Sequence, residues 1–271
     1  VEITVVDQDD HHVYQPGLLF VPFGLANHSE IVRPRQAQLH RDVERVQEPS
    51  ARVDVHAGGV YLLCGLELPY DATVVATGAI LAFDETEGLT GPGWNEKVFT
   101  FYDVAGATGL AAALDNFEGG KLVVNVVDMP IKCPVAPLEF CFLADWYFTD
   151  RGIRDKVEIS YATPLDGAFT KPVASAALSS LLEEKGIHLV TEFNTGEVAM
   201  NDDGAGGKLI GYDGREVPFD LAVVVPMHSG ADYVGRSEGL GDDLNFVPTD
   251  KHTMQATAKS NIFSLGDATN V

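Results

Sequence analysis

The chain has few residues that could cross-link it or chelate a metal. Its 271 residues include only three cysteines, Cys64, Cys133 and Cys141, and no two of them have CxxC or zinc-finger spacing. This small number excludes a disulfide-stapled scaffold. The eight histidines are scattered and form no ligand cluster, so we expect no metal site.

Long apolar runs and basic residues are also scarce. No stretch approaches the roughly 20 apolar residues that a membrane-spanning helix needs, although 45% of the residues are hydrophobic. Eighteen basic residues stand against forty acidic ones, which gives a formal charge of −22. A surface of this sign repels nucleic acid and excludes that class of partner. It is typical either of an ordinary acidic globular protein or of a salt-adapted one.

One sequence pattern occurs twice in the chain. Residues 58–75 and 206–224 each contain an apolar strand, a glycine turn, a Glu-x-Pro-aromatic-Asp segment and a buried Val-Val strand. A repeated supersecondary unit predicts two similar domains. The first copy leads into Ala76-Thr77-Gly78, and a strand near the end of the chain leads into Gly266-Asp267-Ala268.

Strand and helix patterns alternate between the two copies. Strands are predicted at 121–127, 156–162 and 187–193, and helices at 103–118, 137–152 and 172–186. This order predicts a parallel sheet with helices on both faces. The fold class is therefore α/β, with two Rossmann-like three-layer domains. We expect a discontinuous first domain at 1–98 plus 232–271 and a second domain at 99–231.

Three strand-end motifs have the chemistry of a cofactor site. Asp7 ends the first strand, where a Rossmann unit places an acid that binds ribose hydroxyls. The Gly-rich turn that precedes such an acid would lie before Val1. Small residues in Ala76-Thr77-Gly78 and Gly266-Asp267-Ala268 let the backbone approach a ligand, and the Asp267 carboxylate can accept hydrogen bonds from a polyol. The alternative for each motif is an ordinary turn or a solvated carboxylate.

Cys133 is the strongest candidate for chemistry. It lies between a strand that ends at Val127 and a helix that begins near Pro137, where a Rossmann unit has its Gly-rich turn, and this loop contains no glycine. A cysteine near a helix N-terminus and beside Lys132 can have a lowered pKa. Glu139 follows in the first helical turn and could move protons. The alternative is a packed apolar cysteine, and we interpret Cys64 and Cys141 in that structural way.

With these motifs in view, the chain resembles the sulfide:quinone oxidoreductases of the FAD-dependent pyridine nucleotide-disulfide oxidoreductase superfamily. The resemblance covers essentially the whole chain. It depends on four segments, which are residues 14–20, 70–78, 131–140 and 266–271. Residues 250–267, which lead into the last segment, also resemble the family.

The resemblance implies an FAD enzyme that oxidises sulfide through a cysteine persulfide and passes electrons to membrane quinone. In it Cys133 would be the central redox cysteine and Glu139 its acid-base carboxylate. The cofactor-binding residues would be Asp7 at the adenosine ribose, Gln15 and Pro16 near the isoalloxazine ring, Ala76, Thr77 and Gly78 at a strand end, and Gly266, Asp267 and Ala268 near the ribityl phosphate.

The chain departs from the family pattern at its ends and in one loop. The first Gly-rich turn, the partner cysteine expected beyond Val271 and the C-terminal amphipathic helices are absent, so we interpret the chain as a soluble fragment. The full-length protein is then expected on the cytoplasmic side of a membrane, bound peripherally. Histidines that some relatives have after the 156–162 strand are replaced by residues 166–171. A homo-oligomer is compatible with the sequence.

Two other functions stay open at this point. A type II NADH dehydrogenase-like enzyme would need a Gly-rich turn after the 121–127 strand, and the proline-rich Cys133 loop counts against it. A flavin-free interaction module on the same fold is the third hypothesis. Fold analogy alone cannot decide among them, so the sulfide hypothesis depends on Cys133 and its neighbours.

Overall fold

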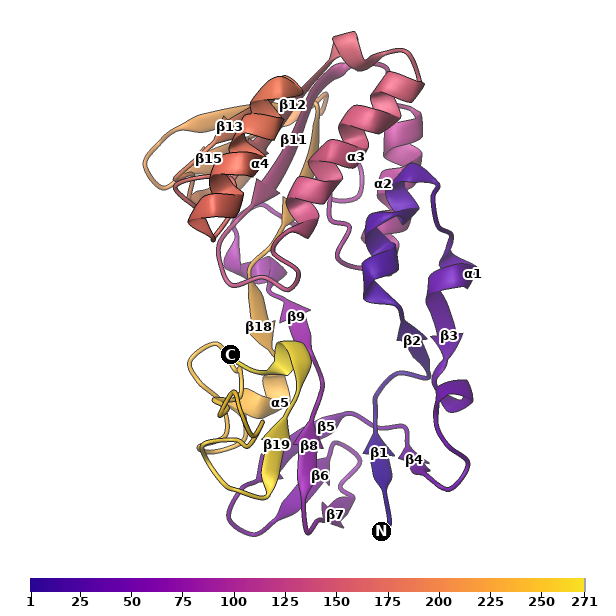
Figure 1. Ribbon diagram of the computed structural model, residues 1–271. Coiled ribbons are helices and arrows are strands. Elements are labelled where there is room, and N and C mark those ends of the chain that lie inside the picture. Colours follow the sequence, from indigo (N-terminus) through magenta and orange to yellow (C-terminus); the bar gives the residue numbers. More distant parts are fainter. Residues whose placement is uncertain (271) are drawn as a thin grey trace. The chain divides into compact units, whose positions relative to one another are not determined.

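The structure is a computed structural model that describes residues 1–270 (Figure 1). Val271, the last residue of the 266–271 motif, lies outside the described residues. The chain forms two compact units. The first unit contains Val1–His12, Val32–Ile80 and the segment from His228 onward, and the second contains Val13–Ile31 and Leu81–Met227.

The unit boundaries differ from the domain boundaries that the sequence suggested. Residues 13–31 and 81–98 group with the second unit, whereas the sequence placed them in the first domain. Phe23 gives the physical reason for the first of these segments. Its ring packs against the rings of Phe140 and Tyr147, with centroid distances of 4.9 and 5.7 Å. These contacts join segments more than 100 residues apart and leave no periodic signal in the sequence.

The second unit is built on a five-stranded parallel sheet with the order β10-β17-β11-β12-β13. Its strands are β10 (Val98–Phe99), β11 (Gly120–Val126), β12 (Val157–Ala162), β13 (Ile187–Val190) and β17 (Leu221–Val225). Strand β11 lies at the centre, with Leu122 paired to Ile159 on one edge and to Leu221 on the other. The β-α-β-α-β order predicted for residues 121–193 is confirmed.

The three predicted helices of this unit are present. They are α2 (Val104–Asp115), α3 (Ala136–Asp150) and α4 (Pro172–Glu184) (Figure 1). The Asp103 side chain caps α2 by accepting a hydrogen bond from Gly106 N at 2.7 Å. Proline occupies the first turn of both α3 and α4, where its missing N–H costs nothing. Helix α3 packs on β11 and β12, α4 on β13, and α2 on β10.

Where the sequence predicted helices on both faces of the sheet, an antiparallel meander covers one face. It consists of β14 (Thr195–Met200), β15 (Gly207–Gly211) and β16 (Glu216–Phe219). Val123 of β11 packs in one buried cluster with Leu209 and Phe219 of the meander. Because side chains alternate along a strand, the neighbours of Val123 in β11 point to the helical face. The three layers are therefore helices, parallel sheet and meander.

A buried polar residue ties the meander to the centre of the sheet. Asn125 of β11 is fully buried, and its Nδ2 donates to Thr195 Oγ1 at 3.0 Å and to Ala162 O at 3.3 Å. Thr195 Oγ1 also lies 3.1 Å from Asn125 Oδ1. These bonds satisfy an amide whose burial would otherwise cost free energy, and they fix β14 against β11.

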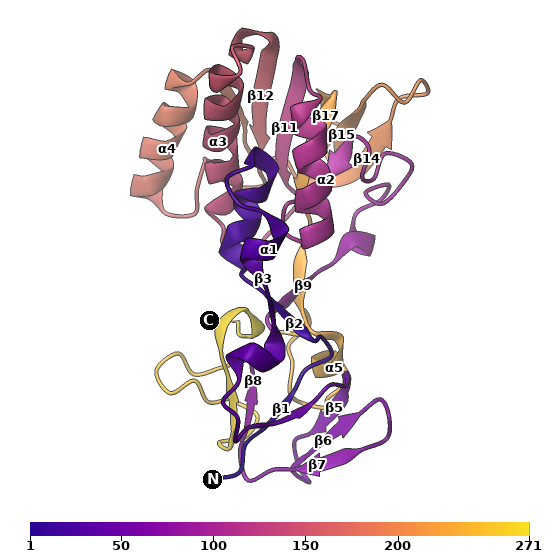
Figure 2. The same ribbon diagram turned by 90° about the vertical axis from the view of Figure 1, so that its right-hand side faces the viewer.

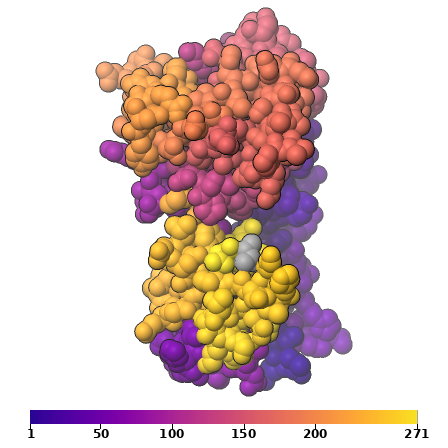
Figure 3. Space-filling view, turned by 60° about the vertical axis from the view of Figure 1, so that its left-hand side comes forward, coloured from indigo at the N-terminus to yellow at the C-terminus, as the bar shows by residue number. Residues whose placement is uncertain are grey.

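The first unit contains short parallel pairs and its own meander. Its parallel pairs are β1 (Thr4–Val6) with β4 (Glu44–Val46) and β8 (Thr73–Val75) with β19 (Ile262–Ser264). The meander is β5 (Ser50–Asp54), β6 (Gly59–Leu62) and β7 (Glu67–Pro69). Its core includes Val53, Val75 and Ile262. In Figure 3 the segment after His228, in yellow tones, forms much of one face of this unit.

The remaining elements are short. Two pairs of strands form two-stranded sheets, namely β2 (His11–Val13) with β3 (Val32–Pro34) and β9 (Ala79–Leu81) with β18 (His228–Gly230) (Figure 2). The short helices are η1 (Gln15–Leu19), η2 (Val21–Phe23), α1 (His28–Ile31), η3 (Arg35–Gln38), η4 (Phe83–Glu85), η5 (Arg154–Lys156), α5 (Asp232–Gly235) and η6 (Gly266–Ala268).

The repeat seen in the sequence is a repeat of structure. In each unit a three-stranded meander leads directly into a strand of a parallel pair or sheet, β8 in the first unit and β17 in the second. Both units are thus Rossmann-like, and the first is discontinuous in sequence. None of the helices in residues 1–270 has the length and apolarity required to cross a bilayer.

Asp145 makes the stability of the second unit sensitive to acid. Its carboxylate lies 2.7 Å from Arg154 Nε and 2.7 Å from Lys185 Nζ, which joins α3 to η5 and to the residue after α4. Burial raises the pKa of this carboxyl, but the bonds from Lys185 and Arg154 outweigh burial and leave the pKa below its usual value of 3.8. The ionised form therefore stabilises the fold above pH 3.8, and this contribution disappears as pH falls through the lower native pKa.

We predict that Asp145→Asn lowers the free energy of unfolding by about 1–3 kcal/mol at pH 7. The difference from the parent should shrink as pH falls below about 4. Urea unfolding at pH 7, 4 and 3 measures it, and the exposed Asp155→Asn is the matched control. An equal loss of stability at pH 7 and pH 3 would contradict the assigned ion pairs.

Candidate functional site

Cys133 lies in the loop between β11 and α3, with its side chain exposed and its main chain fixed. Its carbonyl oxygen accepts two hydrogen bonds, from Tyr102 Oη at 3.2 Å and from Ala136 N at 3.0 Å. Its φ of 47° is in the left-handed region that residues with a β-carbon rarely adopt. The loop therefore presents a cysteine side chain at the carboxyl edge of the sheet, the edge where ligands bind in open α/β sheets.

Tyr102 forms the buried side of this loop. The residue is 5% exposed, and Lys132 Nζ lies 5.7 Å from the centre of its ring. Burial raises the pKa of the Tyr102 phenol well above its ordinary value, and the nearby Cys133, Tyr161 and Glu139 add to the rise. The phenol therefore stays protonated and remains a hydrogen-bond donor. The sequence analysis did not identify Tyr102, because nothing in the pattern shows that it meets a loop 31 residues away.

Glu139 lies in the first turn of α3, as the sequence predicted, and its side chain is exposed. Its backbone N donates to Val135 O at 3.0 Å. Glu139 and Cys133 both raise the pKa of the buried Tyr102 phenol through their charge, which adds to the effect of burial. This places a carboxylate and a thiol in one neighbourhood of the second unit.

Gln15 and Pro16 also belong to the second unit. They open η1 and are exposed, whereas the following Gly17, Leu18 and Leu19 are buried. Gly17 has no room for a side chain, because a β-carbon there would lie 2.3 Å from Ile31 Cγ2. Residues 17–19 therefore anchor this segment in the protein, while Gln15 and Pro16 remain exposed.

The structure brings two of the predicted cofactor motifs together in the first unit. Strands β8 and β19 are parallel, with Val75 opposite Ser264, and Leu265 N donates to Val75 O at 3.0 Å. Ala76-Thr77-Gly78 and Gly266-Asp267-Ala268 consequently follow neighbouring strand ends at one edge. Gly78 (φ 68°) and Gly266 (φ 64°) have left-handed backbones, and no atom lies within 4 Å of a β-carbon built on either.

A cofactor that binds close to the main chain requires glycines of this kind, with open space beside them. Ala76, Thr77 and Asp267 are exposed at this edge, and Ala268 is buried beneath it. The Thr77 hydroxyl lies 3.3 Å from the Tyr233 hydroxyl. The edge therefore combines accessible backbone, a hydroxyl and a carboxylate, a donor and acceptor set that suits a polyol phosphate.

Asp7 follows β1 in the same unit and is half-buried. Its Oδ2 lies 2.6 Å from Arg35 Nε, and its Oδ1 accepts a hydrogen bond from Asp9 N at 3.0 Å. Arg35 also lies 3.1 Å from His12 Nδ1. The carboxylate is thus held in one orientation rather than freely solvated. Arg35 was not identified from the sequence, because it meets Asp7 only through the fold.

The other cysteines differ from each other. Cys141 is fully buried in α3, and burial raises the pKa of its thiol well above the ordinary value. The expected core role of Cys141 agrees with this placement. Cys64, which we interpreted as a structural cysteine, instead lies exposed in the turn between β6 and β7. Among the histidines, His228 is fully buried in β18.

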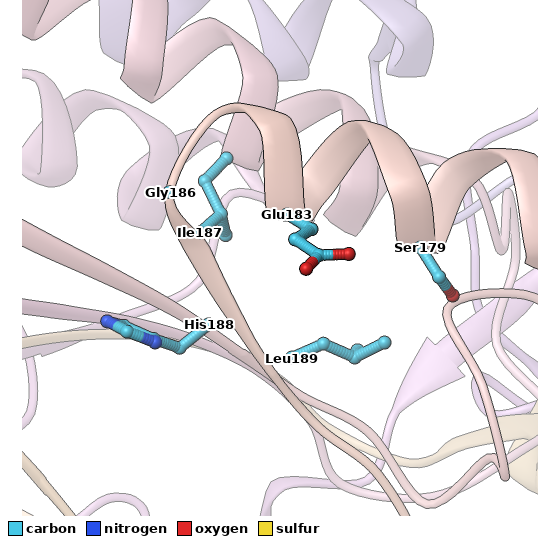
Figure 4. A pocket seen from close by; sticks show the side chains of 6 residues that line it. All are labelled: Ser179, Glu183, Gly186, Ile187, His188 and Leu189. Carbon is cyan, nitrogen blue, oxygen red and sulfur yellow. The ribbon is translucent and has the colours of Figure 1, made fainter.

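A pocket elsewhere in the second unit contains none of the predicted residues. It has a volume of about 460 Å³ and lies between the end of α4 and β13, lined by Ser179, Glu183, Gly186, Ile187, His188 and Leu189 (Figure 4). Serine, glutamate and histidine are the side-chain types of a hydrolytic triad. In Figure 4, however, the His188 ring extends away from the Glu183 carboxylate and from Ser179. The three side chains therefore form no relay.

Within residues 1–270 no group of three or more His, Cys, Asp or Glu side chains could hold a metal ion. No protein-family model matches the chain. The sequence is 26% identical to the mitochondrial sulfide:quinone oxidoreductase of Mus musculus over 271 residues, which cover 99% of this chain and 60% of the mouse protein. The protein of the same name from Schizosaccharomyces pombe is 26% identical over 281 residues, covering 100% of this chain and 60% of the relative.

The solved structures agree with the sequence comparison. The crystal structure of the sulfide:quinone oxidoreductase from Aquifex aeolicus superposes with a TM-score of 0.84 at 20% identity, covering 100% of this chain and 63% of that chain. The chain is similar to the sulfide:quinone oxidoreductases along its whole length. The resemblance stated from the motifs is therefore confirmed, as is the Rossmann-like fold class. The chain spans about 60% of the length of the curated relatives it matches.

The exposure of the three cysteines predicts their order of reaction. In the native protein iodoacetamide should modify Cys64 and Cys133, whereas Cys141 should react only after denaturation, because it is buried and its thiol resists ionisation. Peptide mass mapping after timed alkylation measures this order. Native-state alkylation of Cys141 at the rate of Cys64 would show that α3 does not pack as described.

Proposed function

We propose that the chain is part of an FAD-dependent oxidoreductase that oxidises sulfide at Cys133 and passes the electrons to a quinone. The observation that carries this proposal is the Cys133 loop. An exposed cysteine on a fixed main chain occupies the place where a dinucleotide-binding unit has a Gly-rich turn. The similarity to relatives named sulfide:quinone oxidoreductase supports the choice of sulfide as substrate.

The residues of the first unit fit FAD. Gly78 and Gly266 offer open backbone to the cofactor, with Ala76, Thr77 and Ala268 around them. Asp267 would accept hydrogen bonds from ribityl hydroxyls. When bound, FAD would supply a two-electron acceptor for the sulfur chemistry and a two-electron donor for quinone.

Two further segments complete the proposed cofactor contacts. Asp7, oriented by Arg35, would accept hydrogen bonds from the adenosine ribose. Gln15 and Pro16, exposed at the start of η1, would border the isoalloxazine ring. Both assignments derive from the family resemblance. The exposure of Gln15 and Pro16 and the fixed orientation of Asp7 support them.

The chemistry assigned to this chain's residues is the formation of a persulfide. Hydrosulfide and the Cys133 thiolate would form one S–S bond, and this oxidation would release one proton and two electrons, for which FAD would be the acceptor. Glu139, in the first turn of the helix that follows, accepts the proton. The buried phenol of Tyr102 keeps its own proton throughout, since its pKa is raised by burial.

The longer protein would meet quinone at a membrane surface, bound peripherally on the cytoplasmic side. Sulfide is a small, soluble substrate, whereas quinone is held in lipid, so one partner reaches the site from water and the other from a bilayer. This part of the proposal derives from the resemblance and from the similarity to relatives named sulfide:quinone oxidoreductase.

We predict that Cys133→Ser abolishes the reduction of the bound flavin by sulfide. In anaerobic solution sulfide should bleach the visible flavin absorption of the full-length protein, and the substitution should slow the bleaching about a thousandfold or more, because serine cannot form a persulfide. Cys64→Ser, at the other exposed cysteine, is the matched control and should bleach normally. Bleaching by NADH but not by sulfide would favour a dehydrogenase instead.

We also predict that Asp7→Asn weakens FAD binding about tenfold to a hundredfold, since it removes a charged acceptor from the ribose contact. Equilibrium dialysis of the full-length protein, read by flavin fluorescence, gives the dissociation constant. The exposed Asp9→Asn, two residues away, controls for the loss of one negative charge. Equal affinities in Asp7→Asn and the parent would remove Asp7 from the cofactor site.

A further inference from the structure

The conformation of Cys133 needs a partner to hold it. A φ of 47° is unfavourable for a residue with a β-carbon, and such conformations persist only where surrounding contacts impose them. The two contacts on its carbonyl come from Tyr102 Oη and from Ala136 N. Of these two bonds, the Ala136 bond belongs to the turn that opens α3, whereas the Tyr102 bond comes from a segment 31 residues away.

Tyr102 is itself rigidly placed. Its ring lies 4.8 Å from that of Phe101, and Phe101 stacks on Phe140 of α3 at 5.0 Å. The Tyr102 backbone N donates to Thr100 Oγ1 at 3.3 Å. Because the ring is packed in this aromatic stack, the position of the Tyr102 hydroxyl is restrained independently of the Cys133 loop.

We propose that Tyr102 is the positioning residue of Cys133. Its hydroxyl fixes the Cys133 carbonyl toward the protein interior, which turns the thiol outward at the start of α3. The inference builds on the proposed function, since the thiol so placed is the one assigned to sulfide. The Tyr102 hydroxyl acts on Cys133 through the main chain, at its carbonyl oxygen.

The chemistry of the phenol suits this role. Burial, with the nearby Cys133, Tyr161 and Glu139, keeps the Tyr102 hydroxyl protonated, so it donates to the carbonyl at any pH at which the protein is folded and active. The N-terminus of a helix favours a thiolate, which is the reactive form of cysteine. A Cys133 released from Tyr102 would relax away from this position and lose reactivity.

The test is the alkylation of Cys133 in Tyr102→Phe, which keeps the ring and removes only the hydroxyl. In the full chain, iodoacetamide should modify Cys133 about fivefold more slowly than in the parent, the factor that corresponds to one ordinary hydrogen bond. Cys64, exposed in the first unit, is the internal reference and should react at its parental rate.

Tyr70→Phe is the matched control, because it removes another tyrosine hydroxyl that donates to a carbonyl, Asp54 O at 3.4 Å. It should leave Cys133 unchanged. An unchanged or faster reaction of Cys133 in Tyr102→Phe would overturn the proposal, as would an equal slowing of Cys64. Alkylation requires neither flavin nor sulfide, so a failure here is distinct from a failure of Cys133→Ser to block flavin reduction.

Discussion

The hydrogen bonding of β11 along both of its edges is the constraint on which the second unit depends. With β12 on one side and β17 on the other, most of the strand is buried, and its fully buried polar side chain, Asn125, has to be satisfied inside the fold. Parallel pairing also requires the chain to cross back over the sheet before β12 begins. The turn into that crossover, at the carboxyl end of β11, is the loop that carries Cys133.

Parallel strand pairing also organises the first unit, where it joins residues that are much farther apart in the sequence. Strands β8 and β19 are parallel although about 190 residues separate them, so the segments that follow them emerge at one edge. That is why Ala76-Thr77-Gly78 and Gly266-Asp267-Ala268 become neighbours. The meanders that precede β8 and β17 have the same arrangement. In each, a local antiparallel sheet is followed directly by a parallel strand.

The sequence predicted the features that depend on local pattern. It did not predict the features that depend on contacts between distant segments. Caps, prolines and periodic apolar residues located α2, α3 and α4 to within three residues at each end. The grouping of residues 13–31 with the second unit depends on the ring of Phe23, and the Tyr102 and Arg35 contacts depend on segments that meet only after folding. The meander on the second face of the sheet was missed for the same reason.

The two units differ in what is accessible at their strand ends, which is backbone in the first unit and a side chain in the second. The first has left-handed glycines with open space around them, so its backbone is accessible to a ligand. The second has a loop without glycine between β11 and α3, whose left-handed residue is a cysteine with its carbonyl turned inward. Such a loop cannot present the row of N–H groups that binds a pyrophosphate, but it does present a reactive side chain. On the proposed function, the first Rossmann-like unit would contribute accessible backbone to the cofactor, and the second would contribute the reactive cysteine.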